Sequence, residues 1–221
     1  MRKRLLCLAN SRKWQGRCIA GIDVSTRQWI RPVSDRPTGE LSEAERILPG
    51  GAEAAPLDVV EVCVSAHTPK QYQTENWTID SRFPFRLLGR LNPSVLTSLE
   101  QTPPSLWLNG HSTVVGENDR MPVASSPGPL GSLLLIRANL SILVRNPYQQ
   151  RRVVNARFMY RETPYELRIT DPLVEGSYLR RPIGRYECGE HYLTLSLGQP
   201  FEGHVYKLVA AVIGSATGVR I

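Results

Sequence analysis

The chain has 221 residues, 41% of them hydrophobic and 21% charged, with a net charge of +7. This composition excludes a wholly disordered chain, because such chains combine low hydrophobicity with high charge. No apolar run approaches the roughly 20 residues of a membrane-spanning helix, and the apolar stretch after the basic N-terminus is too short for the core of a secretory signal. We therefore expect a cytoplasmic protein without a membrane partner.

The positive charge is concentrated at the two ends of the chain. Residues 1–40 contain nine basic and three acidic side chains, residues 41–130 contain six and ten, and residues 131–221 contain twelve and seven. Most of the basic residues are arginine, whose planar guanidinium pairs well with phosphate. A GC-rich genome produces the same arginine excess, so the charge is compatible with a nucleic-acid partner and does not by itself establish one.

The apolar segments of the first half are short and bounded by turn residues. Strands are predicted over residues 4–9, 16–24, 28–34 and 57–64, the last with valine on alternate positions. Two short helices are expected at residues 42–47 and 93–101, and residues 109–131 have the Gly, Pro, Ser and Asn content of a loop or linker.

Strands resume in the second half, at residues 132–138, 140–145, 152–160, 164–170, 191–197 and 205–213. The pattern predicts a mainly all-β protein of two small antiparallel barrels, because closing a sheet removes its exposed edges. The first barrel is expected over residues 1–130, with a helical and loop insertion, and the second over residues 131–221.

The sequence contains none of the common catalytic motifs, whether of zinc proteases, serine hydrolases or P-loop enzymes. The strongest enzyme candidate is a pair formed by His111 and Asp119, although a solvated loop explains them as well. The stretch from Glu187 to His191 resembles a metal or thiol cluster, but three types of ligand within five residues of a turn easily occur by chance. The cysteines (Cys7, Cys18, Cys63 and Cys188) are scattered and predict reduced thiols. We expect a non-catalytic protein without cofactor or metal; a cryptic nuclease is the alternative.

Basic residues alternate with aromatic ones near the N-terminus, a pattern typical of surfaces where bases stack and arginine contacts phosphate. Trp29 and Arg31 are two residues apart on a predicted strand and so share a face. The alternative is that Trp29 belongs to the core and Trp14 anchors a loop. The candidate nucleic-acid-binding residues of this half are Arg12, Lys13, Trp14, Arg17, Trp29 and Arg31.

A second basic set follows in the second half, on a predicted hairpin and the loop after it. A solvated basic face explains these residues equally well. They are Arg151, Arg152, Arg157, Tyr160, Arg168, Arg180 and Arg181. A separate polar cluster of Gln73, Glu75 and Asn76 has no periodicity, and either locks a loop by hydrogen bonds or contacts a ligand.

The order of several motifs resembles the bacterial dual-OB-containing domain family, most clearly over residues 3–80. The motifs are Leu8-Ala-Asn-Ser11, Gly16-Arg-Cys18, Trp29-Ile-Arg-Pro-Val-Ser34, Gly39-Glu-Leu41, Leu57-Asp-Val-Val60 and Gln73-x-Glu-Asn76. The resemblance implies two OB-like barrels, nucleic-acid binding and an association with antiviral defence or conflict systems. It supplies no catalytic residue, so the binding residues above follow from charge and aromatic placement alone.

These observations predict a non-catalytic module that binds single-stranded DNA or RNA within a bacterial defence system, beside a protein effector encoded nearby. The alternative is a module that senses a nucleotide or a partner protein, with the ligand held between the two barrels. The acidic middle of the chain motivates this alternative, because amides and carboxylates suit base edges better than phosphates.

Overall fold

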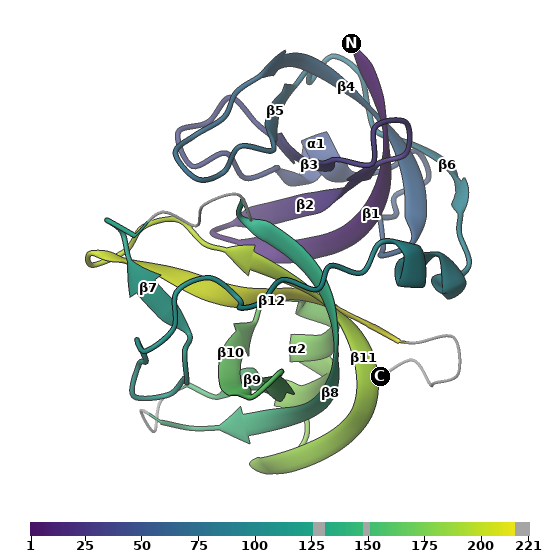
Figure 1. Ribbon diagram of the computed structural model, residues 1–221. Helices are drawn as coiled ribbons and strands as arrows, with labels where there is room; N and C mark the ends of the chain where they lie inside the picture. The colour runs from purple at the N-terminus through teal and green to yellow at the C-terminus, as the bar shows by residue number, and fades with distance from the viewer. Residues whose placement is uncertain (126–130, 148–150, 215–221) are drawn as a thin grey trace. The chain divides into compact units, whose positions relative to one another are not determined.

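The computed structural model describes residues 1–125, 131–147 and 151–214 and divides into two compact units, Met1–Val95 and Leu96–Ile221 (Figure 1). The chain is mostly β, as predicted, with few and short helices. Among the described residues, none of the helices has the length and apolar character needed to cross a bilayer. Each unit is considered below by itself.

The first unit is a closed barrel of five strands with one additional edge strand. Strand β1 pairs with β2 and β4, β3 pairs with β2 and, in parallel, with β5, and the β4–β5 pair closes the ring. The edge strand β6 pairs with β4. The elements are β1 Arg2–Lys13, β2 Gly16–Asp23, β3 Trp29–Val33, α1 Glu43–Arg46, β4 Asp58–His67, β5 Asn76–Ile79 and β6 Arg86–Arg90.

The barrel interior is filled by alternate residues of the strands, as the period of two requires. Val60, Val62 and Val64 of β4 all face this interior, which confirms the alternation predicted for residues 57–64. Ser42 is the N-cap of the short helix α1, and its side chain forms a capping box with Glu45. The buried cluster consists of Leu5, Cys7, Ile19, Ile30, Leu41, Leu48, Ala54, Val60, Val62, Val64, Ile79 and Phe85, with Trp77 packed against it.

The second unit repeats the same strand order. Strand β8 pairs with β9 and β11, β9 pairs with β10, β10 pairs in parallel with β12, and the β11–β12 pair closes the ring. Helix α2 lies in sequence between the third and fourth strands of this barrel, as α1 does in the first. The elements are β7 Arg120–Pro122, β8 Leu133–Arg145, β9 Val153–Tyr160, β10 Thr163–Ile169, α2 Pro172–Leu179, β11 Gly184–Leu197 and β12 His204–Gly214, and the 3-10 helix η1 Pro93–Ser98 spans the division.

The division lies at Val95/Leu96, earlier than the predicted boundary near residue 130. Residues 96–125 belong to the second unit because they bond to its strands. The amide of Gln101 donates to the carbonyl of Leu135 at 2.7 Å, and the Trp107 indole nitrogen donates to the carbonyl of Gly131 at 2.9 Å. Strand β7 adds to the edge of β12. The loop-rich composition of this segment concealed its strand pairing.

Two closed five-stranded barrels with this shared Greek-key order are two OB folds. In OB folds the face of the second and third strands, with the loops between strands one and two and between strands four and five, binds oligonucleotides and oligosaccharides. In the first barrel these regions are β2 and β3, the β1–β2 turn and the loop between β4 and β5.

Candidate nucleic-acid interface

The β1–β2 hairpin ends in an exposed turn that carries Trp14. Trp14 adopts a positive φ of 50° at this turn, and 68% of the residue is exposed. Arg12 and Arg17 face each other across the hairpin. Arg12 is exposed, whereas Arg17 is half-buried and its Nε lies 3.4 Å from a carboxylate oxygen of Glu53. The structure therefore brings one indole and one guanidinium together on an open surface.

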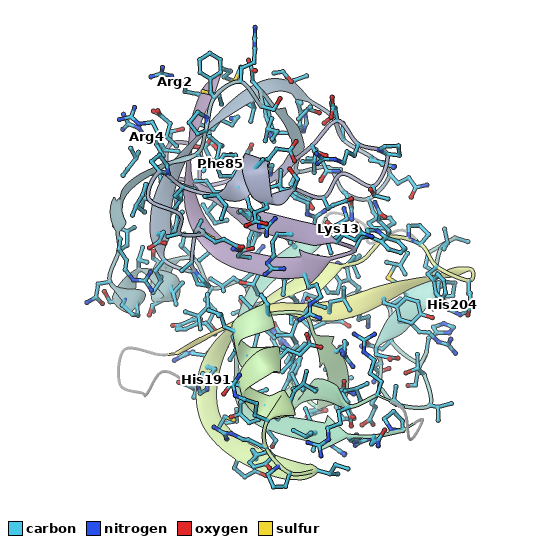
Figure 2. The ribbon with its side chains drawn as sticks, turned by 180° about the vertical axis from the view of Figure 1, so that it is seen from behind. Arg2, Arg4, Lys13, Phe85, His191 and His204 are labelled. Carbon is cyan, nitrogen blue, oxygen red and sulfur yellow. The ribbon has the colours of Figure 1, made fainter. Side chains whose placement is uncertain are left out.

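Lys13, at the end of β1 (Figure 2), is less accessible than its two neighbours. Burial lowers the pKa of its ammonium group, while the nearby Cys18 and Glu40 act in the opposite direction. Arg31 and Lys70 also lower this pKa, which places Lys13 beside two other cations. A half-buried lysine in such surroundings is a weaker phosphate ligand than Arg12.

Arg31 contradicts its predicted role, because its side chain is buried and only 1% exposed. Its Nη1 forms an ion pair of 2.8 Å with Glu75, and the same nitrogen donates to Asn76 Oδ1 at 3.4 Å. The Asn76 amide donates in turn to Gln73 Oε1 at 3.4 Å. The Arg31 backbone amide also donates to the carbonyl of Glu75 at 2.8 Å. An enclosed guanidinium held by a carboxylate is not available to phosphate.

The contacts of Gln73, Glu75 and Asn76 are those of a loop lock. All three are buried, and they join the loop before β5 to strand β3. Trp29, the other predicted stacking residue of β3, is half-buried and lies opposite Ile22 of β2. The structure therefore does not produce the predicted open pair of Trp29 and Arg31, although both residues lie on one strand.

The second basic set is dispersed, and several of its members have structural contacts. Tyr160 is buried and its hydroxyl donates to the carbonyl of Pro103 at 2.7 Å, so its predicted role on a binding surface is wrong. Arg168 is paired at 2.6 Å with the buried Glu175 of α2, which joins β10 to that helix. Neither side chain is placed to stack on a base or to contact a phosphate.

The arginines around the end of α2 have mixed roles. Arg152 donates to the carbonyls of Leu179 and Arg181, so it satisfies acceptors left by the helix terminus. The Arg181 guanidinium lies over the ring of Tyr178 at 4.1 Å. Arg151 and Arg180 are exposed.

Arg157 is a further exposed member of the second set. Its side chain is 44% exposed, and its ion pairs with Glu117 and Glu166 are long, at 3.8 and 4.0 Å. These distances exceed hydrogen-bond length. Arg157 and Arg12 are thus two of the predicted phosphate ligands whose side chains lie at an accessible surface.

The residues predicted as catalytic candidates have structural contacts. The Asp119 carboxylate accepts hydrogen bonds from the backbone amide of Thr113 at 2.8 Å and from the Thr113 hydroxyl at 2.6 Å. Among the residues that the structure describes, no hydrogen bond joins Asp119 to His111. Cys188 lies 3.2 Å from the Tyr178 hydroxyl. Within residues 1–125, 131–147 and 151–214, no group of three or more His, Cys, Asp or Glu side chains is arranged to hold a metal ion.

Comparison with known families agrees with this architecture. The model of the dual OB-containing domain matches residues 3–212, nearly the whole chain. The chain belongs to the dual OB-containing domain family. No curated protein and no solved structure matched it. Membership in the dual OB family indicates a binding module built on OB folds, and leaves the ligand to be inferred from the chain's own residues.

One basic residue that the sequence analysis did not single out is central to the second barrel. Lys207 of β12 is 1% exposed, and its ammonium group donates to Asn109 Oδ1 at 2.9 Å. The Tyr165 hydroxyl donates to the same oxygen at 2.9 Å. Burial lowers the pKa of Lys207 to about 7, and the charge of Asp119 only partly opposes this. The sequence did contain a signal for this burial. Val205, Lys207 and Val209 are two residues apart along the strand and so share one face, and all three are buried.

Proposed function

We propose that this dual OB protein is a non-catalytic module that binds single-stranded nucleic acid through the β1–β2 hairpin of its first barrel. The observation that carries the proposal is the 68% exposure of Trp14 beside the exposed Arg12. Tryptophan is highly buried on average, and an indole exposed at a turn offers a face on which a base can stack. The turn is also the loop between the first two strands, which OB folds use for ligands.

The chemistry of the turn suits a single strand. An indole stacks on any base, because every base has a π-face, and this contact is worth about 1–3 kcal/mol per base. A guanidinium beside the indole binds the phosphate that follows the stacked base. Residues 1–40, with nine basic and three acidic side chains, supply the positive field that attracts a polyanion.

The proposal extends to a bacterial defence system in which the module acts beside a protein effector. The support for this part is the resemblance to the dual OB-containing domain family, which implies an association with defence systems. A non-catalytic binding module takes its role from the protein that it accompanies, and this is why an effector is part of the proposal. The genes next to the coding sequence test this part directly. An adjacent effector gene in several genomes supports it, and a constant neighbourhood of housekeeping genes contradicts it.

The binding proposal is tested by fluorescence anisotropy with short labelled single strands of DNA and of RNA. Replacing Trp14 by Ala is expected to weaken binding by roughly tenfold, since one base loses its stacking partner. Phe83→Ala is a matched control, because Phe83 is also an exposed aromatic residue of the first unit, at 48%, and lies outside the hairpin. Equal affinities of the wild type and the Trp14→Ala variant would contradict the proposed interface.

A further inference from the structure

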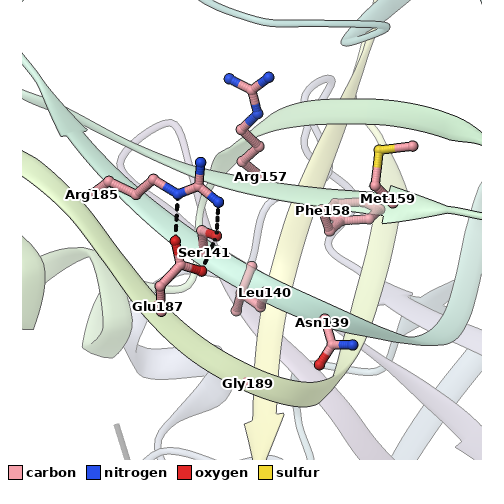
Figure 3. A pocket seen from close by; sticks show the side chains of 9 residues that line it. All are labelled: Asn139, Leu140, Ser141, Arg157, Phe158, Met159, Arg185, Glu187 and Gly189. Carbon is pink, nitrogen blue, oxygen red and sulfur yellow. Dashed lines mark hydrogen bonds and ion pairs between the residues drawn. The ribbon is translucent and has the colours of Figure 1, made fainter.

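The outer surface of the second barrel contains a pocket of about 360 Å³ on strands β8, β9 and β11 (Figure 3). This volume falls within the range of about 300–1,000 Å³ found for small-molecule sites. Its lining combines cations, hydrogen-bonding groups and apolar surface. The lining residues are Asn139, Leu140, Ser141, Arg157, Phe158, Met159, Arg185, Glu187 and Gly189.

A β-bulge shapes one wall of this pocket. The pairing of β8 with β11 shifts register between Glu187 and Gly189, and Gly189 has a positive φ of 76°. Bulges re-aim side chains and occur next to functional sites. Glycine at this position satisfies the left-handed backbone and adds no side chain to the wall of the pocket.

Two arginines provide the charge of the pocket. Arg185 is oriented by Ser141, to whose hydroxyl it donates at 3.1 Å, and by Glu187, which lies 2.5 Å from its Nε. Both oxygens of Glu187 are engaged, because the second accepts from Ser141 at 2.6 Å. Among the described residues, the ion pairs of the Arg157 guanidinium are the two long ones given above. Glu187 is the carboxylate partner of Arg185, whereas the carboxylates nearest to Arg157 lie beyond hydrogen-bond length. The Arg157 guanidinium is therefore the main group in the lining that can take an anion, with the remaining N–H groups of Arg185 beside it.

The remaining lining suits a flat, partly apolar group with polar edges. Met159 rises from β9 on the same side as Arg157, two residues away, and is 55% exposed (Figure 3). Its polarisable thioether makes favourable contacts with aromatic rings. The Asn139 side chain can donate and accept hydrogen bonds at the rim. An anionic group joined to an aromatic ring with polar edges is the chemistry of a nucleotide.

We propose that this pocket binds one nucleotide unit, with the phosphate on Arg157 and Arg185 and the base against Met159. The pocket residues belong to the second unit and the β1–β2 hairpin belongs to the first, so the two proposals rest on different residues and can be tested independently. The same chemistry is offered by a free nucleoside monophosphate and by one residue of a strand.

Isothermal titration of the full chain with AMP and UMP tests the pocket, with uridine and inorganic phosphate as partial ligands. The nucleotides are expected to bind more tightly than either partial ligand. Arg157→Ala and Arg185→Ala are expected to weaken nucleotide binding roughly tenfold or more, since each removes a charge-assisted hydrogen bond to phosphate. Met159→Ala is expected to weaken nucleotide binding and leave phosphate binding unchanged. Arg137→Ala is the matched control: its side chain, on β8, is 42% exposed against 44% for Arg157, and it lies outside the pocket.

Oligonucleotide binding by the Arg157→Ala variant distinguishes the two sources of the nucleotide. A parallel loss of mononucleotide and oligonucleotide affinity identifies the occupant as one residue of a strand, and an unchanged oligonucleotide affinity identifies a free nucleotide. Both results support the pocket. The absence of saturable mononucleotide binding, or binding that neither arginine variant weakens, would overturn it, whatever the Trp14→Ala result.

Discussion

Each barrel buries one long basic side chain to about 1% exposure, and the two cations are accommodated in different ways. Arg31 of the first barrel faces the carboxylate of Glu75, whereas Lys207 of the second faces the amide oxygen of Asn109. An arginine cannot give up its proton in a protein, so its burial requires an opposite charge; a lysine can lose its proton. The comparison teaches that a basic residue predicted to lie on a binding surface can instead be part of the interior. It also teaches that the group facing a buried basic side chain decides whether that side chain is charged.

The largest expected effect comes from separating the Arg31 ion pair. Arg31→Ala leaves Glu75 buried without its cation, which is expected to lower the free energy of unfolding by about 3–5 kcal/mol. Urea denaturation followed by circular dichroism measures this loss. The double variant Arg31→Met/Glu75→Leu should recover much of it, because no buried charge remains. A loss below about 1 kcal/mol, the usual value for an exposed pair, would show that Arg31 is not locked as described.

Lys207 is expected to make the protein more stable as the pH rises. A lysine in a stabilising ion pair has the opposite effect, because its pKa is raised by folding. Its pKa in the folded chain is about 7, below the ordinary 10.5, so the unfolded chain binds the proton more readily. Stability therefore rises as pH increases from about 7 toward 10.5 and gains nothing from this group below pH 7. The rise between pH 7 and pH 9 is expected to be about 2 kcal/mol.

The Lys207→Met variant isolates this contribution. It should be more stable than the wild type at pH 7 and should lose the rise attributable to Lys207, because methionine fills the space without a charge to desolvate. Thermal unfolding at a series of pH values gives the comparison. Parallel pH profiles for the two proteins would show that Lys207 remains protonated inside the barrel and that the contrast with Arg31 is mistaken.

A smaller effect is expected at Tyr160. Tyr160→Phe removes the hydrogen bond to Pro103 and is expected to cost about 1 kcal/mol of stability. Oligonucleotide affinity, measured by anisotropy, should not change, because the ring is buried. A weakened affinity with unchanged stability would show that Tyr160 contacts the oligonucleotide, and would contradict its assignment to the interior.

The strands that alternate or are apolar throughout could be predicted, and the ones that are exposed throughout could not. Residues 57–64 show the period of two because valines fill the barrel. Strand β6 was missed because all five of its residues are exposed, so no alternation marks it. The first half of β11 was missed for the same reason, since most of Gly184–Glu190 is exposed.

The candidate site was predictable only in part. Periodicity placed Trp29 and Arg31 on one face of a predicted strand, and both do lie on β3, but periodicity could not show whether that face is open. The carboxylate that encloses Arg31 lies on a distant loop, and pairing between distant segments leaves no local pattern. The exposed Trp14 was easier to identify, because a turn between two strands is at the surface in nearly every fold.

The central claim, that the module binds single strands through the exposed Arg12 and Trp14 of the β1–β2 hairpin, is tested most directly by oligonucleotide titrations at increasing salt. We predict that the logarithm of the affinity falls linearly with the logarithm of the salt concentration, with a slope of about 0.7 for each phosphate contacted. Arg12→Ala should reduce that slope by roughly one contact. No binding at low salt, or an affinity that salt does not change, would contradict the account.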